Sequence, residues 1–356
     1  MALFNKFPYS NAHELNLDWI LEQIQNLTPA GDMSPEYVQQ KMQIFNVKDF
    51  GAVGDGITDD TQAFLDAIAA VPEMGGVVFT PPGTYIISQT LILGNGTNTS
   101  VSDYNNIALI GSGGTLWAGI SIPNYYAGTI LQWAGPATDC MIEVHGPING
   151  CRISNLILNG NSALDYGMRI WCSQWGEYDR ITIAACNVQG LGLEQWGGQD
   201  GSITSNNILN RFSQISVFCP FTGNATCFYI GGDPDNLIND SNMNTFDNIA
   251  LFRHPAGKGL HIGFSDASSM RNLIVWCNGV STTGIDVLLD GSEVTGFPSA
   301  WLFENMSGTI VCQGTIGMMT ILGYGMGDGE SLPNDLVKCA GWTHDHYTFG
   351  TWIPAP

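Results

Sequence analysis

One short pattern recurs six times between residues 153 and 308 and constrains the fold more than any other feature of the chain. Each copy starts with a bulky residue and, three positions later, reaches two apolar residues separated by one other. The copies span 153–158, 178–183, 212–217, 246–251, 270–275 and, more weakly, 303–308. Their starts lie 25, 34, 34, 24 and 33 residues apart. Because strands that repeat every ~20 to 50 residues are typical of solenoids, the pattern predicts a stack of β-coils.

Composition and charge narrow the possible partners. The 356 residues include 44 Gly, only 12% are charged, and the net charge is −21. Nucleic acid and anionic membrane surfaces require clustered Lys and Arg, so neither is an expected partner. The same charge disfavours a strongly anionic polymer as ligand, unless a cation bridges the two. The sequence has no basic-then-apolar leader and no apolar run of ~18 residues, so we expect neither export nor membrane insertion.

Residues 1–45 differ from the rest and predict a helical segment. Asn11 and Glu14 have the spacing of a capping box. An apolar seam with a/d spacing follows, formed by Leu17, Ile20, Ile24 and Leu27. This seam favours self-association or docking, with packing of the helix on its own chain as the alternative.

The opening of the coil region, residues 46–95, predicts a cap for the open end of the solenoid. A strand at 47–50 leads into glycine turns, and Asp59 and Asp60 then favour the start of an amphipathic helix. Strands are expected at 77–79 and 85–87. An amphipathic helix beside the first coil would cover its unpaired backbone.

Residues 47–61 and 75–85 closely resemble the opening of the pectate-lyase-like superfamily, which includes polygalacturonases and phage tailspike depolymerases. The resemblance implies an all-β fold, a right-handed single-stranded parallel β-helix over 46–325, with the short N-terminal α-helical segment before it and a tail at 326–356 after it. The leader at 7–19 resembles leaders of phage structural proteins. It implies a virion appendage, made in the bacterial cytoplasm, that attaches to other virion structural proteins through its N-terminus and forms a homotrimer.

The register of the repeats predicts which side chains point outward. Asn155, Asn248, Asn272 and Asn305 share one position and are expected to form an amide ladder at a left-handed bend. A neighbouring outward column holds three aromatic residues on successive coils, Phe218, Phe252 and Trp276. Because an exposed aromatic stripe is unfavourable in a monomer, we interpret it as an oligomer interface. A stacking platform for sugar rings is the alternative.

A second sheet predicts a carbohydrate-binding surface. One outward column is expected to hold Arg169, Gly192, Tyr229, His261 and Asp286, and its neighbour Trp171, Glu194, Gly231, Gly263 and Leu288, with Trp175 and Trp196 in nearby loops. Indole rings stack on pyranose faces, and carboxylates accept hydrogen bonds from sugar hydroxyls. The candidate substrate-binding residues are Arg169, Trp171, Trp175, Trp196, Tyr229 and His261.

Glycoside hydrolysis requires two carboxyl groups ~5 to 10 Å apart. Residues of the second coil and its loop supply the candidate catalytic acids, Glu177, Asp179, Glu194 and Asp200. The polygalacturonase signatures are absent from the coil region, and basic residues are too few to favour a lyase. No motif indicates a cofactor, and no metal site is expected.

Three hypotheses follow for a virion appendage that meets a host surface glycan. Under the first hypothesis the appendage is a depolymerase that uses the acids named above. Under the second it is a non-catalytic receptor-binding or decoration protein of the tail or capsid, and under the third it is a purely structural spike. Fold analogy supports all three equally, because function depends on sites grafted onto folds.

Overall fold

The computed structural model describes residues 43–94, 106–116, 126–194, 207–219, 223–231, 241–277, 283–291, 298, 300–306, 308, 310–314, 319–324 and 337–340. The chain divides into two units, Met1–Ile44 and Phe45–Pro356. The helical segment expected at 1–45, with Leu17, Ile20, Ile24 and Leu27, lies outside the described residues except at its last positions. The expected tail is described only at 337–340.

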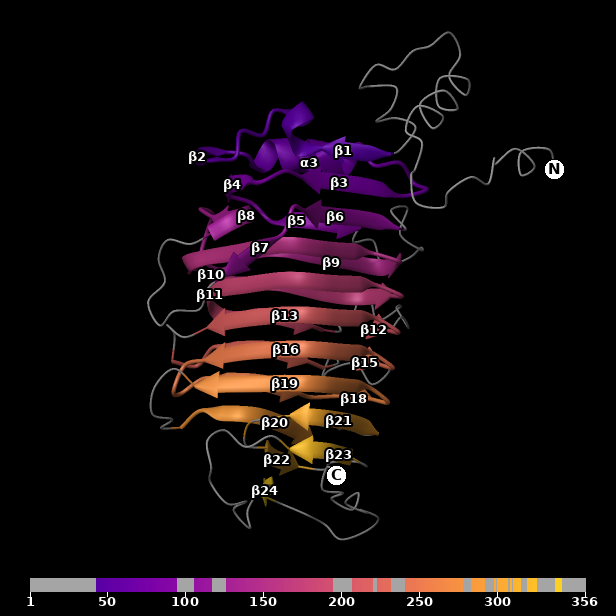
Figure 1. The fold of residues 1–356 in the computed structure, drawn as a ribbon, viewed down its shortest axis with the longest axis vertical. Helices are drawn as coiled ribbons and strands as arrows, with labels where there is room; N and C mark the ends of the chain where they lie inside the picture. The colour runs from indigo at the N-terminus through magenta and orange to yellow at the C-terminus, as the bar shows by residue number, and fades with distance from the viewer. Residues whose placement is uncertain are drawn as a thin grey trace, which may run out of the picture. The chain divides into compact units, whose positions relative to one another are not determined.

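Successive coils of the second unit pair their strands in parallel, and Figure 1 shows these strands stacked in chain order. We name three series of paired strands sheets 1, 2 and 3. Sheet 1 consists of β3 (Gly76–Thr80), β6 (Ile107–Gly111), the first parts of β10 (Arg152–Gln174) and β11 (Glu177–Leu193), β13 (Arg211–Cys219), β16 (Thr245–Arg253), β19 (Ser269–Cys277), β21 (Trp301–Met306) and β23 (Met319–Tyr324).

Sheet 2 runs beside sheet 1 along the same coils. It consists of β5 (Leu91–Gly94), β9 (Cys140–Asn149), the later parts of β10 and β11, β14 (Thr226–Ile230), β17 (Lys258–Ile262), β20 (Ile285–Gly291), β22 (Ile310–Gly314) and β24 (Val337–Ala340). Sheet 3 is short and consists of the ends of β9 and β10 with β12 (Asn207–Ile208), β15 (Ser241–Asn242) and β18 (Ser265–Asp266). The predicted all-β parallel β-helix class is confirmed.

The first strands complete the N-terminal end of the stack. They are β1 (Ile44–Asn46), β2 (Asp55–Asp59), β4 (Gly83–Ile87), β7 (Gly114–Leu116) and β8 (Tyr126–Trp133). β4 pairs in parallel with β2 and β8, whereas β7 pairs antiparallel with β8. Among the described residues, no helix is long and apolar enough to cross a membrane.

The first residue of each repeat stacks on its equivalent in the next coil, inside the solenoid. Tyr178 pairs with Phe212, Phe212 with Phe246, and Phe246 with Met270. The ring centroids of Tyr178 and Phe212 lie 4.7 Å apart, those of Phe212 and Phe246 5.0 Å apart, and both pairs are stacked. Because each fully buried side chain of this size contributes about 1.5–3 kcal/mol, these residues dominate one continuous core.

Two left-handed corners mark each of six coils. The first-corner residues are Gly150, Trp175, Leu209, Met243, Ala267 and Ala300, and the second-corner residues are Asn155, Arg180, Gln214, Asn248, Asn272 and Asn305. All have φ between 49° and 67°, and the second corner always follows the first by five residues. The variation in coil length therefore falls outside this five-residue segment.

The amide ladder expected at the second corner is confirmed. Asn272 Nδ2 donates to Asn248 Oδ1 (3.1 Å), and Asn305 Nδ2 donates to Asn272 Oδ1 (3.3 Å). In the first coils Arg180 Nε donates to Asn155 Oδ1 (2.7 Å). Asparagine tolerates the left-handed conformation better than most residues, which explains its recurrence at this corner.

A second amide network, buried near the first corner, joins successive coils. Asn210 Oδ1 accepts from Gly176 N (2.8 Å) and Ser173 Oγ (3.0 Å), and its Nδ2 donates to Ser173 O (2.8 Å). Asn244 Oδ1 in turn accepts from Asn210 N (3.0 Å). These side chains satisfy backbone groups that turn away from the strand ladders, as buried polar groups require.

The N-terminal cap differs in part from expectation. The helix α3 (Thr61–Ala69) and strands β3 and β4 are confirmed, but Val47–Phe50 forms a 3-10 turn, η2, and not a strand. Asn46 Oδ1 accepts from Lys48 N (3.0 Å) and so caps this turn. Asp60 precedes α3 without capping it, because its carboxylate accepts from Val53 N (2.6 Å) and Gly54 N (3.1 Å).

Replacing Asn210 by Ala should lower the free energy of unfolding by about 3 kcal/mol, because several buried groups lose their partners at once. The control is Asn272→Gly, which removes a rung of the exposed ladder while keeping a residue that tolerates positive φ. We expect its cost to be below about 1 kcal/mol. Urea denaturation curves measure both, and equal losses would show that the two amide networks are equivalent.

Candidate functional site

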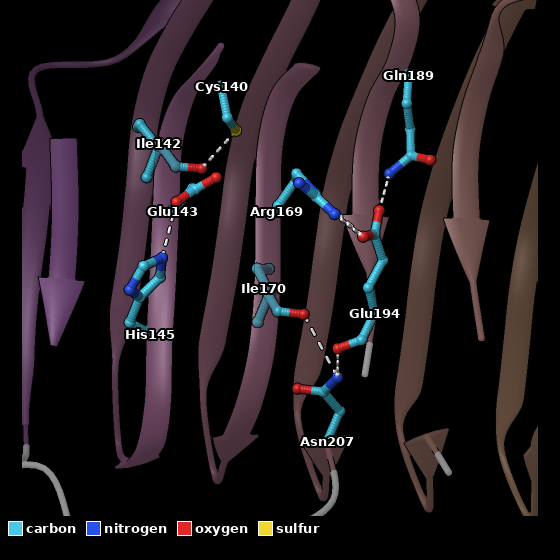
Figure 2. A network of polar contacts seen from close by, with 9 residues as sticks. All are labelled: Cys140, Ile142, Glu143, His145, Arg169, Ile170, Gln189, Glu194 and Asn207. Atoms are coloured by element: carbon cyan, nitrogen blue, oxygen red, sulfur yellow. Dashed lines mark hydrogen bonds and ion pairs between the residues drawn. The ribbon is translucent and has the colours of Figure 1, made fainter. Parts of the chain in front are cut away.

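The outer surface of sheet 2 carries a row of polar and aromatic side chains, which we name the polar face. Its residues are Glu143, His145, Arg169, Trp171, Gln189, Glu194, Tyr229, His261 and Asp290. Alternation of the strands places all of them except Gln189 outside, because neighbours such as Ile142, Val144 and Ile170 are fully buried. Gln189 has the phase of the buried Leu191, but its amide contacts Glu194. Figure 2 shows the part of this face formed by β9, β10 and β11.

Arg169 and Glu194 form the most buried ion pair of the polar face. Arg169 Nη2 and Nε lie 2.6 and 3.0 Å from Glu194 Oε2, and the side chains are 14% and 13% exposed. Gln189 Nε2 donates to the other carboxylate oxygen, as Figure 2 shows. Burial alone would lower the pKa of Arg169, but the Glu194 carboxylate outweighs it and raises this pKa above its ordinary value. Both oxygens of Glu194 are thus engaged.

Gly192 makes this geometry possible. A Cβ atom at this position would overlap Gln189 Nε2 and Glu194 Oε1. Without it, both side chains lie flat over the strand and meet above the glycine. Arg169 also places its guanidinium carbon 4.8 Å from the centre of the Tyr166 ring, a cation–π contact that fixes it from the other side.

Glu143 and His145 form a second pair on β9. His145 Nε2 lies 2.7 Å from Glu143 Oε2, and the His145 ring centroid lies 4.8 Å from that of Trp171. Trp171 is only 6% exposed. The indole predicted to stack on sugar therefore supports His145 and does not offer its face to a ligand.

Tyr229, His261 and Asp290 form the third group, on β14, β17 and β20. The rings of Tyr229 and His261 meet edge to face with centroids 5.0 Å apart, and His261 Nε2 lies 3.3 Å from Asp290 Oδ2. The predicted column through Arg169, Gly192, Tyr229 and His261 is confirmed by the strand register.

The last member of each predicted column is wrong. His261 pairs with Leu288, not with Asp286, so the register predicted for this strand is shifted by two residues. Asp286 instead binds Arg253, whose Nη2 lies 2.6 Å from Asp286 Oδ1 in a nearly buried ion pair. A Cβ at Gly284 would overlap the same arginine, so the glycine makes room for it.

The structure does not bring the three described candidate acids together. Glu177 and Asp179 lie on sheet 1, where they pair with Arg211 and Ser213, whereas Glu194 follows the part of β11 that belongs to sheet 2. Glu177 contacts Arg152 (3.2 Å) at the surface, and Asp179 accepts from Ser213 Oγ. Glu177 and Asp179 lie on a different sheet from Glu194 because β11 passes around a corner of the coil between them. Asp200 lies outside the described residues.

The candidate tryptophans are also dispersed. Trp175 is 62% exposed but occupies the first corner, between sheet 3 and sheet 1, and Trp196 lies outside the described residues. The aromatic column of sheet 1 is real: Phe218 and Phe252 stack at 4.2 Å, and Phe252 and Trp276 at 6.4 Å. Phe218 is 7% exposed and Trp276 64%, so only the later part of the column faces solvent.

Sequence reasoning missed Glu143, His145, Gln189 and Asp290. The first two precede the first recognised repeat at residue 153, so their strand was not counted as a coil. The alternation of Glu143 and His145 with buried Ile142 and Val144 is the signal that was available. Asp290 was missed through the two-residue shift in β20.

Replacing Gly192 by Ala should push Gln189 and Glu194 apart and lower the free energy of unfolding by about 1–2 kcal/mol. Gly223→Ala is the control, because a Cβ there meets nothing closer than His254 Cε1 at 3.9 Å. Urea denaturation of both variants measures the difference. Equal stability of the two would contradict the proposed role of Gly192 in assembling the polar face.

Sequence comparisons agree with the expectation from residues 47–85. The family model Pect-lyase_RHGA_epim, rhamnogalacturonase A/epimerase, pectate lyase-like, matches residues 44–125. Plasmin and fibronectin-binding protein A of Streptococcus pneumoniae is 32% identical over 143 residues, which cover 34% of this chain and 18% of that protein. The chain spans less than a fifth of the length of the first curated relatives it matches.

Solved structures share the coil architecture at low identity. ORF18 of Geobacillus virus E2 has a TM-score of 0.52 at 17% identity and covers 93% of this chain and 63% of its own. The A-module of the mannuronan C-5 epimerase AlgE6 from Azotobacter vinelandii has a TM-score of 0.57 at 20% identity, covering 79% and 70%. The Dettilon tailspike protein has a TM-score of 0.52 at 10% identity, covering 86% and 55%. The stacked coils and these likenesses show that the chain has a parallel β-helix fold, and its residues 44–125 match the pectate lyase-like family model.

Proposed function

We propose that the chain is a bacteriophage virion appendage that binds a host surface glycan on the polar face of sheet 2. The observation that carries this proposal is the unbroken row of outward polar side chains on β9, β10, β11, β14, β17 and β20. With strands ~4.8 Å apart, six neighbouring strands span about 24 Å, a length suited to a polymer and not to a small molecule.

The chemistry of the polar face suits sugar hydroxyls. Carboxylates of Glu143 and Asp290 accept hydrogen bonds, and Tyr229 and His261 add donors and a partly exposed ring. Ion pairs and ring contacts already hold these side chains in place, so binding would cost little side-chain entropy. Fold likeness to a virus protein and a tailspike supports the virion setting.

Attachment and self-association belong to the same proposal. The apolar seam Leu17–Ile20–Ile24–Leu27 would join the appendage to other virion proteins or to its own copies. The exposed part of the sheet 1 surface, Phe252, Ile274 and Trp276, would pack between protomers of a homotrimer.

Loss of Tyr229 or His261 side chains should weaken glycan binding about tenfold, since each removes one contact worth about 1.4 kcal/mol. The measurement is retention on an array of bacterial surface oligosaccharides by wild type, Tyr229→Ala and His261→Ala. Arg271→Ala, an exposed change on sheet 1, is the control and should bind like wild type. Absence of any retained glycan, or an equal loss in the control, would contradict binding on the polar face.

Depolymerisation is a second candidate, favoured by one observation. Glu143 on β9 and Glu194 after β11 lie on the same face with β10 between them. The register places Gly192 opposite Glu143 and Glu194 two residues farther along, which separates the two backbones by about 12 Å. Inverting glycosidases hold their carboxyl groups ~6.5–9.5 Å apart. These two acids replace the sheet 1 acids Glu177 and Asp179 as the pair to test.

If the protein shortens a glycan, Glu143→Gln should reduce the release of reducing ends at least about a hundredfold, because a general acid or base is lost. Asp179→Asn should retain the activity, since Asp179 lies on sheet 1. Reducing-end assays on host envelope polysaccharide measure both variants. Full activity of Glu143→Gln would exclude this acid from the reaction.

A further inference from the structure

We infer that the glycan bound on the polar face is uncharged, an inference that rests on the function proposed above. The argument depends on where the cations of this chain lie. A uronate, sialate or phosphate group needs Lys or Arg partners when it leaves water, because an unpaired anion is costly to desolvate.

The sequence limits the cations to a few known places. Of the 11 Lys and Arg, Lys6 and Lys41 lie near the N-terminus of the sequence, and Lys338 lies on β24, the last strand of sheet 2. The other eight are Lys48, Arg152, Arg169, Arg180, Arg211, Arg253, Lys258 and Arg271, and all of them are described. The segments between residues 95 and 318 that the structure does not describe contain no Lys or Arg. They contain six acids instead, namely Asp103, Asp200, Asp233, Asp235, Asp240 and Glu293.

Six of these eight residues lie away from the polar face. Lys48 belongs to the N-terminal turn, and Arg253 is nearly buried against Asp286. The remaining four, Arg152, Arg180, Arg211 and Arg271, lie on the sheet 1 strands or at their corner. Sheet 2 therefore carries Arg169, Lys258 and, on its last strand β24, Lys338 among the described Lys and Arg residues.

Arg169 is committed to Glu194 through two nitrogen atoms, and little of either side chain is exposed. The two histidines of the face each contact a carboxylate of their own, His145 with Glu143 and His261 with Asp290. On the described polar-face strands β9, β10, β11, β14, β17 and β20, Lys258 is thus the one Lys or Arg that forms no ion pair with a carboxylate. One lysine opposed by a chain of net charge −21 makes a poor site for a polyanion.

An uncharged sugar fits the same surface without this penalty. Its hydroxyl groups donate to the paired carboxylates and accept from Gln, His and Tyr, so no charge has to be neutralised. Glu194 has a definite part in this selectivity, because it occupies the arginine that an acidic sugar would otherwise use.

The first test compares neutral and acidic bacterial oligosaccharides on one array, with EDTA present so that no divalent cation bridges two anions. We expect the retained glycans to be uncharged, and their binding to change less than about twofold between about 0.05 and 0.5 M NaCl. Retention confined to acidic glycans would overturn the inference while leaving the proposed function intact. Retention of no glycan of either kind would overturn the proposed function itself.

The second test frees Arg169. In Glu194→Gln the amide keeps the shape of the carboxylate but not its charge, so acidic oligosaccharides should gain at least about fivefold in affinity, an effect that salt weakens. Glu177→Gln is the matched control, because it removes a carboxylate paired with Arg152 on sheet 1 and should leave the preference unchanged. Thermal unfolding verifies that both variants are folded. An unchanged preference in Glu194→Gln would refute the assigned role of Glu194.

Discussion

Parallel backbone pairing between successive coils, kept in one register from β10 to β21, sets the position of the outward side chains described above. Tyr178, Phe212, Phe246, Met270 and Phe303 follow one another inside the solenoid because each strand repeats the phase of the one before it. The same phase lines up Arg169, Gly192, Tyr229 and His261 outside. A shift of one residue would exchange the two faces, so the core and the polar face are specified together.

Much of this arrangement could be predicted from the sequence, because the signal lies in repetition. The strands of sheet 1, the capping helix and the asparagine ladder follow from residue type at a fixed register. The positions of the candidate site residues could not be predicted in the same way, because they depend on where the chain turns between sheets. Glu177 begins β11 and Glu194 directly follows its last residue, 17 positions later, and the corner that β11 passes around places them on different sheets. The position of Asp286 was predicted wrongly by two residues. Gly284 makes room for Arg253, and this packing role cannot be recognised from the spacing of glycines in the sequence.

The side chains of the polar face are held in place by contacts with one another. Each carboxylate that could meet a ligand already contacts an arginine or a histidine, and Gly192 lets Glu194 lie flat against the strand. Such pairs contribute little to stability where they are exposed. Their larger effect is on specificity, because they fix donors and acceptors in position and leave few charges for a ligand to neutralise.

The constant distance between the two corners has a bearing on how such a protein diversifies. Since five residues always separate the corners, additions and deletions between coils accumulate on the other part of the circuit, which includes sheet 2. A lineage could therefore exchange segments beside the polar face while the asparagine networks keep the scaffold unaltered. Sequence variation beside sheet 2 and a constant scaffold at the two corners would then occur on different parts of the same coil.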